Sequence, residues 1–136
     1  MTNQDEINEL NSIIKARIGV SKIHGVGVIA TRDISKGEMV YADRMPKVYQ
    51  VPYGSMSKLF PEVREIILER WPSIINRGRF IAPDARLLSF MNHSEGDESN
   101  YDPATDTAIR DIKKGEEITE NYKTMENWSK IYSWLK

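Results

Sequence analysis

The chain has 136 residues, which suits one domain, because a single hydrophobic core typically serves about 100 to 200 residues. It has no cysteine and only two histidines, which excludes disulfides, thiolate nucleophiles and cysteine-based zinc sites. A net charge of -1 gives no global reason to bind nucleic acid or an anionic membrane. The apolar runs are too short to span a bilayer and the amino end is polar and acidic, so we expect a soluble intracellular protein, cytoplasmic if bacterial.

The first predicted element is a helical extension over residues 1–12. Apolar residues recur there at helical spacing, and the acidic pair that begins at Asp5 suits a helix start. Near Lys15 the pattern changes to the alternation of a strand. Gly25-Val26-Gly27 then interrupts two β-rich stretches, which predicts a strand, a glycine turn and a second strand through Ala30.

A seven-residue motif occurs twice in the chain. Arg32–Glu38 and Arg110–Glu116 both read Arg-Asp-Ile-x-Lys-Gly-Glu, and each copy lies between two apolar, strand-like runs. The Lys-Gly pair allows a tight turn with positive φ at the glycine, and the isoleucine can fill the core beneath it. We therefore expect the same turn twice, in two small sheets of related shape.

The middle of the chain, residues 45–86, is predicted to be a variable insert with a helix around residues 56–71. Pro61 suits the first turn of this helix, and Pro72 is expected to end it after Trp71. Residues 95–106 are polar and rich in acidic side chains, which predicts a loop.

A second amphipathic helix is predicted at the carboxyl end, over residues 123–136. Thr124 is a plausible N-cap for it. Its apolar residues fall on one stripe, which usually packs against a core. The members of this stripe are Met125, Trp128, Ile131, Tyr132 and Leu135.

Three short segments carry the functional argument, and each has an ordinary interpretation when taken alone. Gly25-Val26-Gly27 lacks the third glycine and the following helix of a dinucleotide-binding turn, which excludes a Rossmann site. Asn92-His93-Ser94 reads as a polar turn, and a serine hydrolase is disfavoured because Ser94 directly follows His93 without a nucleophile-elbow sequence. Gly115–Tyr122 reads as a hairpin that enters a strand.

Taken together and in this order, the three segments resemble the active-site framework of SET-domain protein lysine methyltransferases. The resemblance covers residues 13–122 and includes the two Arg-Asp-Ile-x-Lys-Gly-Glu turns. It implies a mostly β fold with a few helices, the β-clip of small twisted sheets. In that fold the Asn92–Ser94 segment threads past the segment that ends at Tyr122 to form a pseudoknot, a departure from the usual absence of knots. The whole chain, residues 1–136, would be a single SET domain.

The resemblance also implies roles for particular residues. S-adenosylmethionine would lie along the backbone of His24, Gly25, Val26 and Gly27, while Asn92 and the backbone of His93 would bind its methionine portion, and the product would be S-adenosylhomocysteine. Tyr122 would be the catalytic residue, where cofactor and substrate meet, and no metal is needed. Trp128 and Tyr132 on the terminal helix are candidates to close the substrate channel. The partner would be a protein or peptide that presents a lysine and is basic around it.

Two alternatives stay open from the sequence. One is a SET-like module that binds a peptide and no longer transfers methyl groups, and the other is a structural β-clip domain with a different small-molecule ligand. The motive for the first is the acidic stretch Glu95–Ser99, which delays Asn100 by two positions relative to the pattern of the family. This loop has to bulge or turn differently for Asn92 and Tyr122 to meet.

Overall fold

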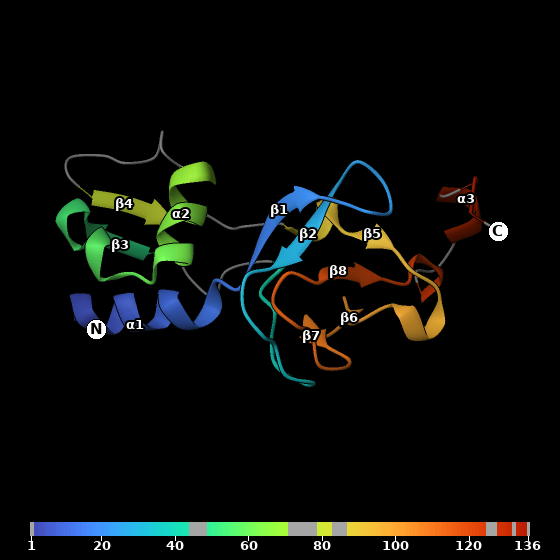
Figure 1. Ribbon diagram of the computed structural model, residues 1–136, viewed down its shortest axis with the longest axis horizontal. Coiled ribbons are helices and arrows are strands. Elements are labelled where there is room, and N and C mark those ends of the chain that lie inside the picture. The colour runs from blue at the N-terminus through green and yellow to red at the C-terminus, as the bar shows by residue number, and fades with distance from the viewer. Residues whose placement is uncertain are drawn as a thin grey trace.

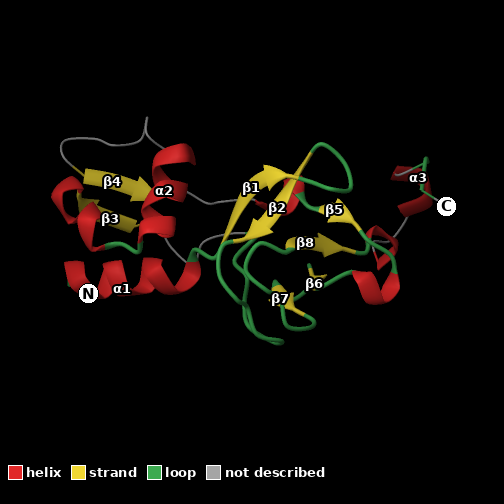
Figure 2. Ribbon diagram, in the orientation of Figure 1, coloured by secondary structure: helices red, strands yellow, loops and turns green. Residues whose placement is uncertain are grey.

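The computed structural model describes residues 2–43, 49–70, 79–82, 87–124, 128–131 and 133–135. It is built of small sheets and short helices, as predicted (Figures 1 and 2). The helices are α1 (Asn3–Ile13), α2 (Pro61–Arg70) and α3 (Trp128–Ile131), with 3-10 turns η1 (Tyr53–Lys58), η3 (Leu87–Phe90), η4 (Gly96–Glu98) and η5 (Tyr122–Thr124). The strands are β1 (Ala16–Val20), β2 (Val26–Ala30), β3 (Tyr49–Pro52), β4 (Arg79–Ala82), β5 (Asn92–His93), β6 (Tyr101–Asp102), β7 (Thr107–Ala108) and β8 (Glu117–Glu120).

The largest sheet has the strand order β1-β2-β8-β5, and it positions the candidate site. Its first three strands pair antiparallel, whereas β5 and β8 pair parallel, with Asn92 opposite Thr119 and His93 opposite Glu120. The Asn-His segment therefore lies beside the strand that leads to Tyr122, although about thirty residues separate them. This neighbourhood agrees with the fold that the resemblance implies, while the threading of a pseudoknot stays a prediction.

The glycine turn lies slightly earlier than predicted. Residues 21–25 form the connection between β1 and β2, and Gly25 has a positive φ of 52°. Val26 and Gly27 already belong to β2, so the prediction that they form the turn was wrong. At Gly27 the strand leaves no room for a side chain, because Glu117 and Asn92 lie too close to it, as described below.

The two copies of the repeated motif pair with each other instead of forming two related sheets. Ile34 and Ile112 exchange both backbone hydrogen bonds at 2.8 Å, and both side chains are fully buried. Gly37 and Gly115 have the predicted positive φ angles, 85° and 87°. The expectation of two separate small sheets was thus wrong, because each copy satisfies the polar backbone of the other.

Reciprocal side-chain contacts strengthen this pairing. Asp111 accepts a hydrogen bond from the backbone N–H of Lys36 at 2.8 Å, and Asp33 accepts the equivalent bond from Lys114 at 2.8 Å. The contacts relate the copies by an approximate twofold axis. The equal spacing in the two copies of the motif therefore has a structural cause, since each Asp stabilises the turn of the other copy.

Replacing Gly115 with alanine tests the turn geometry. Its φ of 87° is unfavourable for any residue with a Cβ atom, and no atom lies within 4 Å of the site of that Cβ. The whole cost is thus conformational, and we expect the free energy of unfolding to fall by about 1 kcal/mol. Gly54→Ala is the matched control, because Gly54 has the same open space without a positive φ. Equal stability of the two variants in urea titrations would contradict the explanation.

The buried side chains form two clusters, one on each side of the molecule in Figure 1. The first cluster joins α1 to β3, η1 and α2, so the helical extension packs against the insert. Arg32 connects this part to the larger sheet, because its guanidinium donates to the carbonyls of Asn11 and Ile14 at the end of α1. The second cluster lies around the sheet that carries the site, and it consists of Ala16, Val28, Ala30, Ile34, Val40, Ala42, Leu87, Met91, Tyr101, Ala108, Ile112 and Ile118.

The helix predicted around residues 56–71 is present as η1 and α2, and α2 begins at Pro61 as expected. The predicted stop at Trp71 and Pro72 lies outside the described residues. Two other boundaries were wrong. Residues 95–106 contain η4 and β6 and are not a continuous loop, and residues 122–124, at the start of the predicted terminal helix, form η5. Of that helix the structure describes α3, and the residues directly after Thr124 lie outside the described part.

Candidate functional site

Asn92 lies where three distant segments meet. Its side-chain nitrogen Nδ2 lies 2.9 Å from the carbonyl oxygen of Val26 and 3.2 Å from that of His24. The same nitrogen lies 3.0 Å from the hydroxyl of Ser21 and 3.0 Å from a carboxylate oxygen of Glu117. An amide nitrogen has two hydrogens, so these four acceptors share them. Asn92 therefore fastens β5 to the turn after β1 and to β8, while its oxygen Oδ1 has no recorded partner among the described residues.

Gly27 is required by close packing against this network. A Cβ atom at Gly27 would lie 2.5 Å from a carboxylate oxygen of Glu117 and 3.1 Å from Nδ2 of Asn92. Ser21 is part of the same cluster, because its hydroxyl lies 2.8 and 2.9 Å from the two carboxylate oxygens of Glu117. The glycine thus lets β2 approach Asn92 closely, which explains why this sequence position carries no side chain.

Tyr122 is held at both of its polar ends, by His93 in β5 and by Met91 just before it. Its backbone N–H donates to Nδ1 of His93 at 2.9 Å, and its hydroxyl donates to the carbonyl oxygen of Met91. The rings of His93 and Tyr122 are 5.2 Å apart with a tilt of 42°. Because Nδ1 of His93 accepts a hydrogen bond, its proton belongs on Nε2, which lies 3.2 Å from Glu95. The tyrosine ring and hydroxyl therefore have a defined position next to Asn92.

Glu95 links the loop after β5 to the segment after β8. Its carboxylate lies 2.8 Å from the ammonium group of Lys123, in addition to its contact with His93. These two hydrogen bonds hold the pKa of the Glu95 carboxyl below its ordinary value. The contact is exposed, so we expect it to orient His93 and to add little to stability.

A cavity of about 660 Å³ opens next to these residues. Its size is typical of small-molecule sites, and its wall is mainly apolar and aromatic with a few polar groups. Of the residues that the sequence predicted for the cofactor, His24, Asn92 and His93 line it beside Tyr122, whereas Gly25, Val26 and Gly27 do not. Val26 reaches Asn92 through its backbone carbonyl. The lining consists of Ile23, His24, Asn92, His93, Tyr122 and Trp134.

Trp134 is a site residue that the sequence analysis missed. Its ring meets that of Tyr122 edge-on, with centroids 6.5 Å apart at 75°. The terminal stripe at helical spacing did not include this tryptophan, and only its aromatic type could have indicated it. Trp128 lies under the ammonium group of Lys123, 5.3 Å from it, and does not line the cavity. Tyr132 lies outside the described residues.

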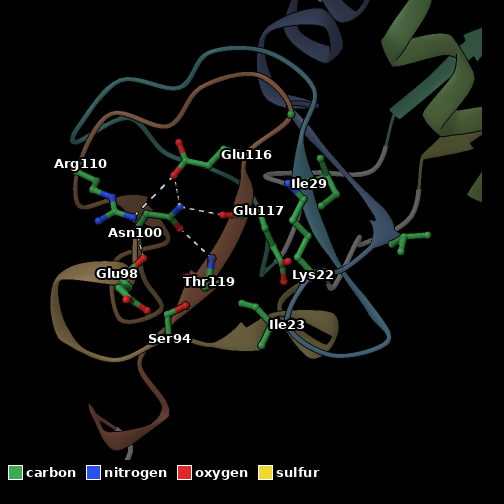
Figure 3. Close-up of a pocket in the computed structure, with 12 residues that line it drawn as sticks. Lys22, Ile23, Ile29, Ser94, Glu98, Asn100, Arg110, Glu116, Glu117 and Thr119 are labelled. Carbon is green, nitrogen blue, oxygen red and sulfur yellow. Dashed lines mark hydrogen bonds and ion pairs between the residues drawn. The ribbon is translucent and has the colours of Figure 1, made fainter.

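The lengthened loop after Ser94 turns back through η4, and Asn100 reaches the neighbouring strand (Figure 3). The side chain of Asn100 accepts from the backbone N–H of Thr119 at 2.8 Å and donates to the carbonyl of Glu117 at 2.9 Å. The two extra residues are thus absorbed in the 3-10 turn, and β5 keeps its place beside β8. The lining of the cavity of about 340 Å³ in this view includes Asn100 and Arg110, and both are already paired with Glu116.

The described part of the chain contains neither a metal-binding cluster nor a membrane-spanning helix. No three His, Asp or Glu side chains there converge in a way that could hold a metal ion. None of the described helices is long and apolar enough to cross a membrane.

Comparison with known proteins gave one family and several distant structures. The family model described as the SET domain matches residues 25–123. Comparison with curated proteins gave no match. Among solved structures, the apo form of ctPRC2 in an autoinhibited state is 23% identical and has a TM-score of 0.46 over 90% of this chain. Polycomb Repressive Complex 2 of Chaetomium thermophilum bound to GSK126 is 22% identical, with a TM-score of 0.47 over 97% of this chain.

A humanized mutant of the Chaetomium thermophilum complex, bound to the inhibitor GSK126, is 21% identical and has a TM-score of 0.48 over 94% of this chain. This chain covers only 17 to 20% of the three chains that it matches. At this level of similarity the structures carry no argument about activity, and the match to the family model is the informative result.

Proposed function

This chain belongs to the SET-domain family, and from that premise we propose that it is an S-adenosylmethionine-dependent methyltransferase that acts on a lysine side chain of a protein. The family in general consists of lysine methyltransferases, and its model covers the three segments that form the candidate site. The observation that carries the proposal is the cavity at which His24, Asn92 and Tyr122 come together.

The residues at this cavity fit S-adenosylmethionine in size and chemistry. The ligand has a charged amino-acid end and an aromatic base, and the cavity offers the amide of Asn92, whose Oδ1 has no recorded partner among the described residues, and the ring of Trp134. An amide oxygen accepts hydrogen bonds from an ammonium group, and an indole ring is suited to stacking against a base. Asn92, the backbone of His93 and the backbone of His24 would hold the ligand. When bound, it supplies a methyl group on a cationic sulfonium.

Tyr122 would orient the amine of the substrate. Its hydroxyl donates its proton to the carbonyl of Met91, so toward an amine the hydroxyl oxygen would act as the acceptor. Methyl transfer to an amine is an in-line displacement, in which alignment of the reacting atoms supplies much of the acceleration. The fixed position of the hydroxyl supports this role, since His93 and Met91 hold the two polar ends of Tyr122.

Titration with S-adenosylhomocysteine tests the cofactor assignment directly. We expect a dissociation constant in the micromolar range by calorimetry, which corresponds to about -8 kcal/mol. No heat at millimolar ligand would contradict the proposal and favour a peptide-binding module without methyl transfer. A labelled-methyl assay on a cell lysate, followed by mapping of the modified residue, then tests the activity and identifies the substrate. The arrival of Asn100 on β8 removes the main structural motive for the inactive alternative.

A further inference from the structure

The backbone of the loop after β5 is held from several directions. The carbonyl groups of residues 95–98 all accept hydrogen bonds. The first accepts from the N–H of Glu98 at 2.9 Å, and the second accepts from Ser99, through its backbone N–H at 3.2 Å and its hydroxyl at 2.8 Å. The guanidinium of Arg110 donates to the other two, the carbonyls of Asp97 and Glu98 (Figure 3). The loop therefore has a defined shape, although its side chains are exposed.

The contact made by Arg110 has a counterpart in the other copy of the repeated motif. Arg32 begins that copy, and its guanidinium donates to the carbonyls of Asn11 and Ile14 at the end of α1. Arg110 begins the second copy and donates to two carbonyls at the end of η4. The forked guanidinium presents several donors in one plane, which suits it to two neighbouring acceptors. The second copy of the motif thus attaches the loop after β5 to the paired turns.

Glu95, at the start of this loop, reaches the segment of Tyr122 along two routes. Its carboxylate lies 2.8 Å from Nζ of Lys123, the residue after Tyr122, and 3.2 Å from Nε2 of His93. Nδ1 of His93 in turn accepts from the backbone N–H of Tyr122 at 2.9 Å. These three contacts, together with the peptide bond between Tyr122 and Lys123, form a closed ring.

The donors and acceptors in this ring are fixed by their chemistry. The hydrogen bonds to Lys123 and to His93 hold the pKa of the Glu95 carboxyl below its ordinary value, so at neutral pH the group is ionised and can only accept. The backbone N–H of Tyr122 can only donate. Both partners of His93 therefore require the same tautomer, with the proton on Nε2 and a lone pair on Nδ1. Without the carboxylate, one of the two hydrogen bonds recorded for this ring is lost.

We propose that Glu95 is a positioning residue for Tyr122, acting through His93 and Lys123, and that Arg110 maintains the loop from which Glu95 acts. The proposal rests on the proposed function, and it gives the lengthened acidic stretch a role in turnover. Glu95 does not line the cavity of about 660 Å³, whereas His93 and Tyr122 do. Its effect is therefore on the alignment of Tyr122 and not on ligand contact. Because a displacement of about 1 Å can lower a rate by about 100-fold, an exposed contact that adds little stability can still matter for turnover.

Glu95→Ala tests this role in a labelled-methyl assay on the protein substrate that is mapped in the lysate. We expect kcat to fall about 10-fold, because Tyr122 loses part of its support, while KM changes by less than about twofold. The affinity for S-adenosylhomocysteine and the melting temperature should stay nearly unchanged, since the lost contact is exposed and outside the cavity. A kcat equal to that of the wild type would overturn the proposal.

Glu98→Ala is the matched control. It removes the same charge from the same loop, and its side chain has no recorded hydrogen bond or ion pair among the described residues, since only its backbone meets Arg110. Its kcat should equal that of the wild type. An equal loss in Glu95→Ala and Glu98→Ala would mean that the loop acts through its overall charge, and the positioning role would then be wrong.

Glu95→Gln separates the hydrogen bond from the charge. The amide oxygen of glutamine can still accept from Nε2 of His93, whereas the ion pair with Lys123 is lost. We therefore expect kcat to stay within about threefold of the wild-type value, because a neutral acceptor still orients the ring. A loss as large as that in Glu95→Ala would refute the transmission of the effect through His93.

Hydrogen exchange at the Tyr122 amide gives a readout that needs no ligand. This N–H donates to His93, so Glu95→Ala should speed its exchange at least about fivefold through more frequent local opening, and Glu98→Ala should not. Unchanged exchange in Glu95→Ala would contradict the proposal, whatever the turnover.

The two proposals fail in distinguishable ways. If the wild-type protein neither binds S-adenosylhomocysteine nor transfers methyl groups, the methyltransferase proposal is refuted, while faster exchange at Tyr122 in Glu95→Ala still supports the positioning contact. If the wild-type protein transfers methyl groups and Glu95→Ala matches it in both kcat and exchange, the positioning role alone is refuted.

Discussion

Replacing Tyr122 with phenylalanine is expected to lower the turnover of lysine methylation at least about 100-fold, while the affinity for S-adenosylhomocysteine changes by less than about twofold. The ring of phenylalanine preserves the contacts with His93 and Trp134, which lie on either side of it. Only the hydroxyl is lost, and with it the group that is fixed by the carbonyl of Met91 and is proposed to orient the amine. The substitution is therefore expected to lower kcat and to leave the affinity for S-adenosylhomocysteine nearly unchanged.

The measurement is a single-turnover labelled-methyl assay, paired with calorimetry on the same preparations. Tyr49→Phe serves as a matched control, because it also removes one buried tyrosine hydroxyl, but in the first hydrophobic cluster beside α1. Its turnover should equal that of the wild type. Unchanged turnover in Tyr122→Phe would refute the catalytic assignment, and a parallel loss of S-adenosylhomocysteine affinity would instead point to a damaged cavity.

Asn92→Ala is expected to weaken S-adenosylhomocysteine binding by about 10- to 100-fold, in keeping with the loss of hydrogen bonds to a charged group. Two effects combine in this variant. The amide that lines the cavity is removed, and the carbonyls of His24 and Val26 lose the donor that holds them in place. Asn92→Asp should be at least as severe, because its added negative charge would lie against Glu117 and those two carbonyl oxygens.

Asn8→Ala, on the exposed face of α1, is the control for the substitution itself and should leave the affinity unchanged. Calorimetry at one fixed salt concentration gives the comparison. If Asn92→Ala binds S-adenosylhomocysteine as tightly as the wild type does, Asn92 is a purely structural brace, and the proposed orientation of the ligand is wrong.

Much of the fold could be read from local sequence patterns. The helix that ends at Ile13, the strand after Lys15 and the start of α2 at Pro61 follow from short-range periodicity and capping, which act within one element. The positive φ of Gly37 and Gly115 was predictable for the same reason, since a Lys-Gly turn needs it. The pairing of the two motif copies was not predictable locally, because it joins residues that are 78 positions apart.

Some residues of the candidate site were likewise predictable from the sequence, and others were not. Asn92, His93 and Tyr122 were identified from their sequence context, and the structure places them at one cavity. Trp134 was missed because its position in a short terminal segment follows no periodic pattern. The burial of Glu120 was likewise not predictable, since a glutamate near the end of a strand is ordinarily exposed, and only tertiary packing shows that it is buried.

By itself the sequence determined the class of the protein: residue types and their order specify a small, cysteine-free, mostly β chain with the SET-domain segments. Tertiary structure alone decided whether those segments meet. The parallel pairing of β5 with β8, kept in place by Asn100 despite the lengthened loop, brings Asn92 and Tyr122 to one cavity. It also decided which side chains are buried, because burial depends on long-range packing and local sequence does not encode it.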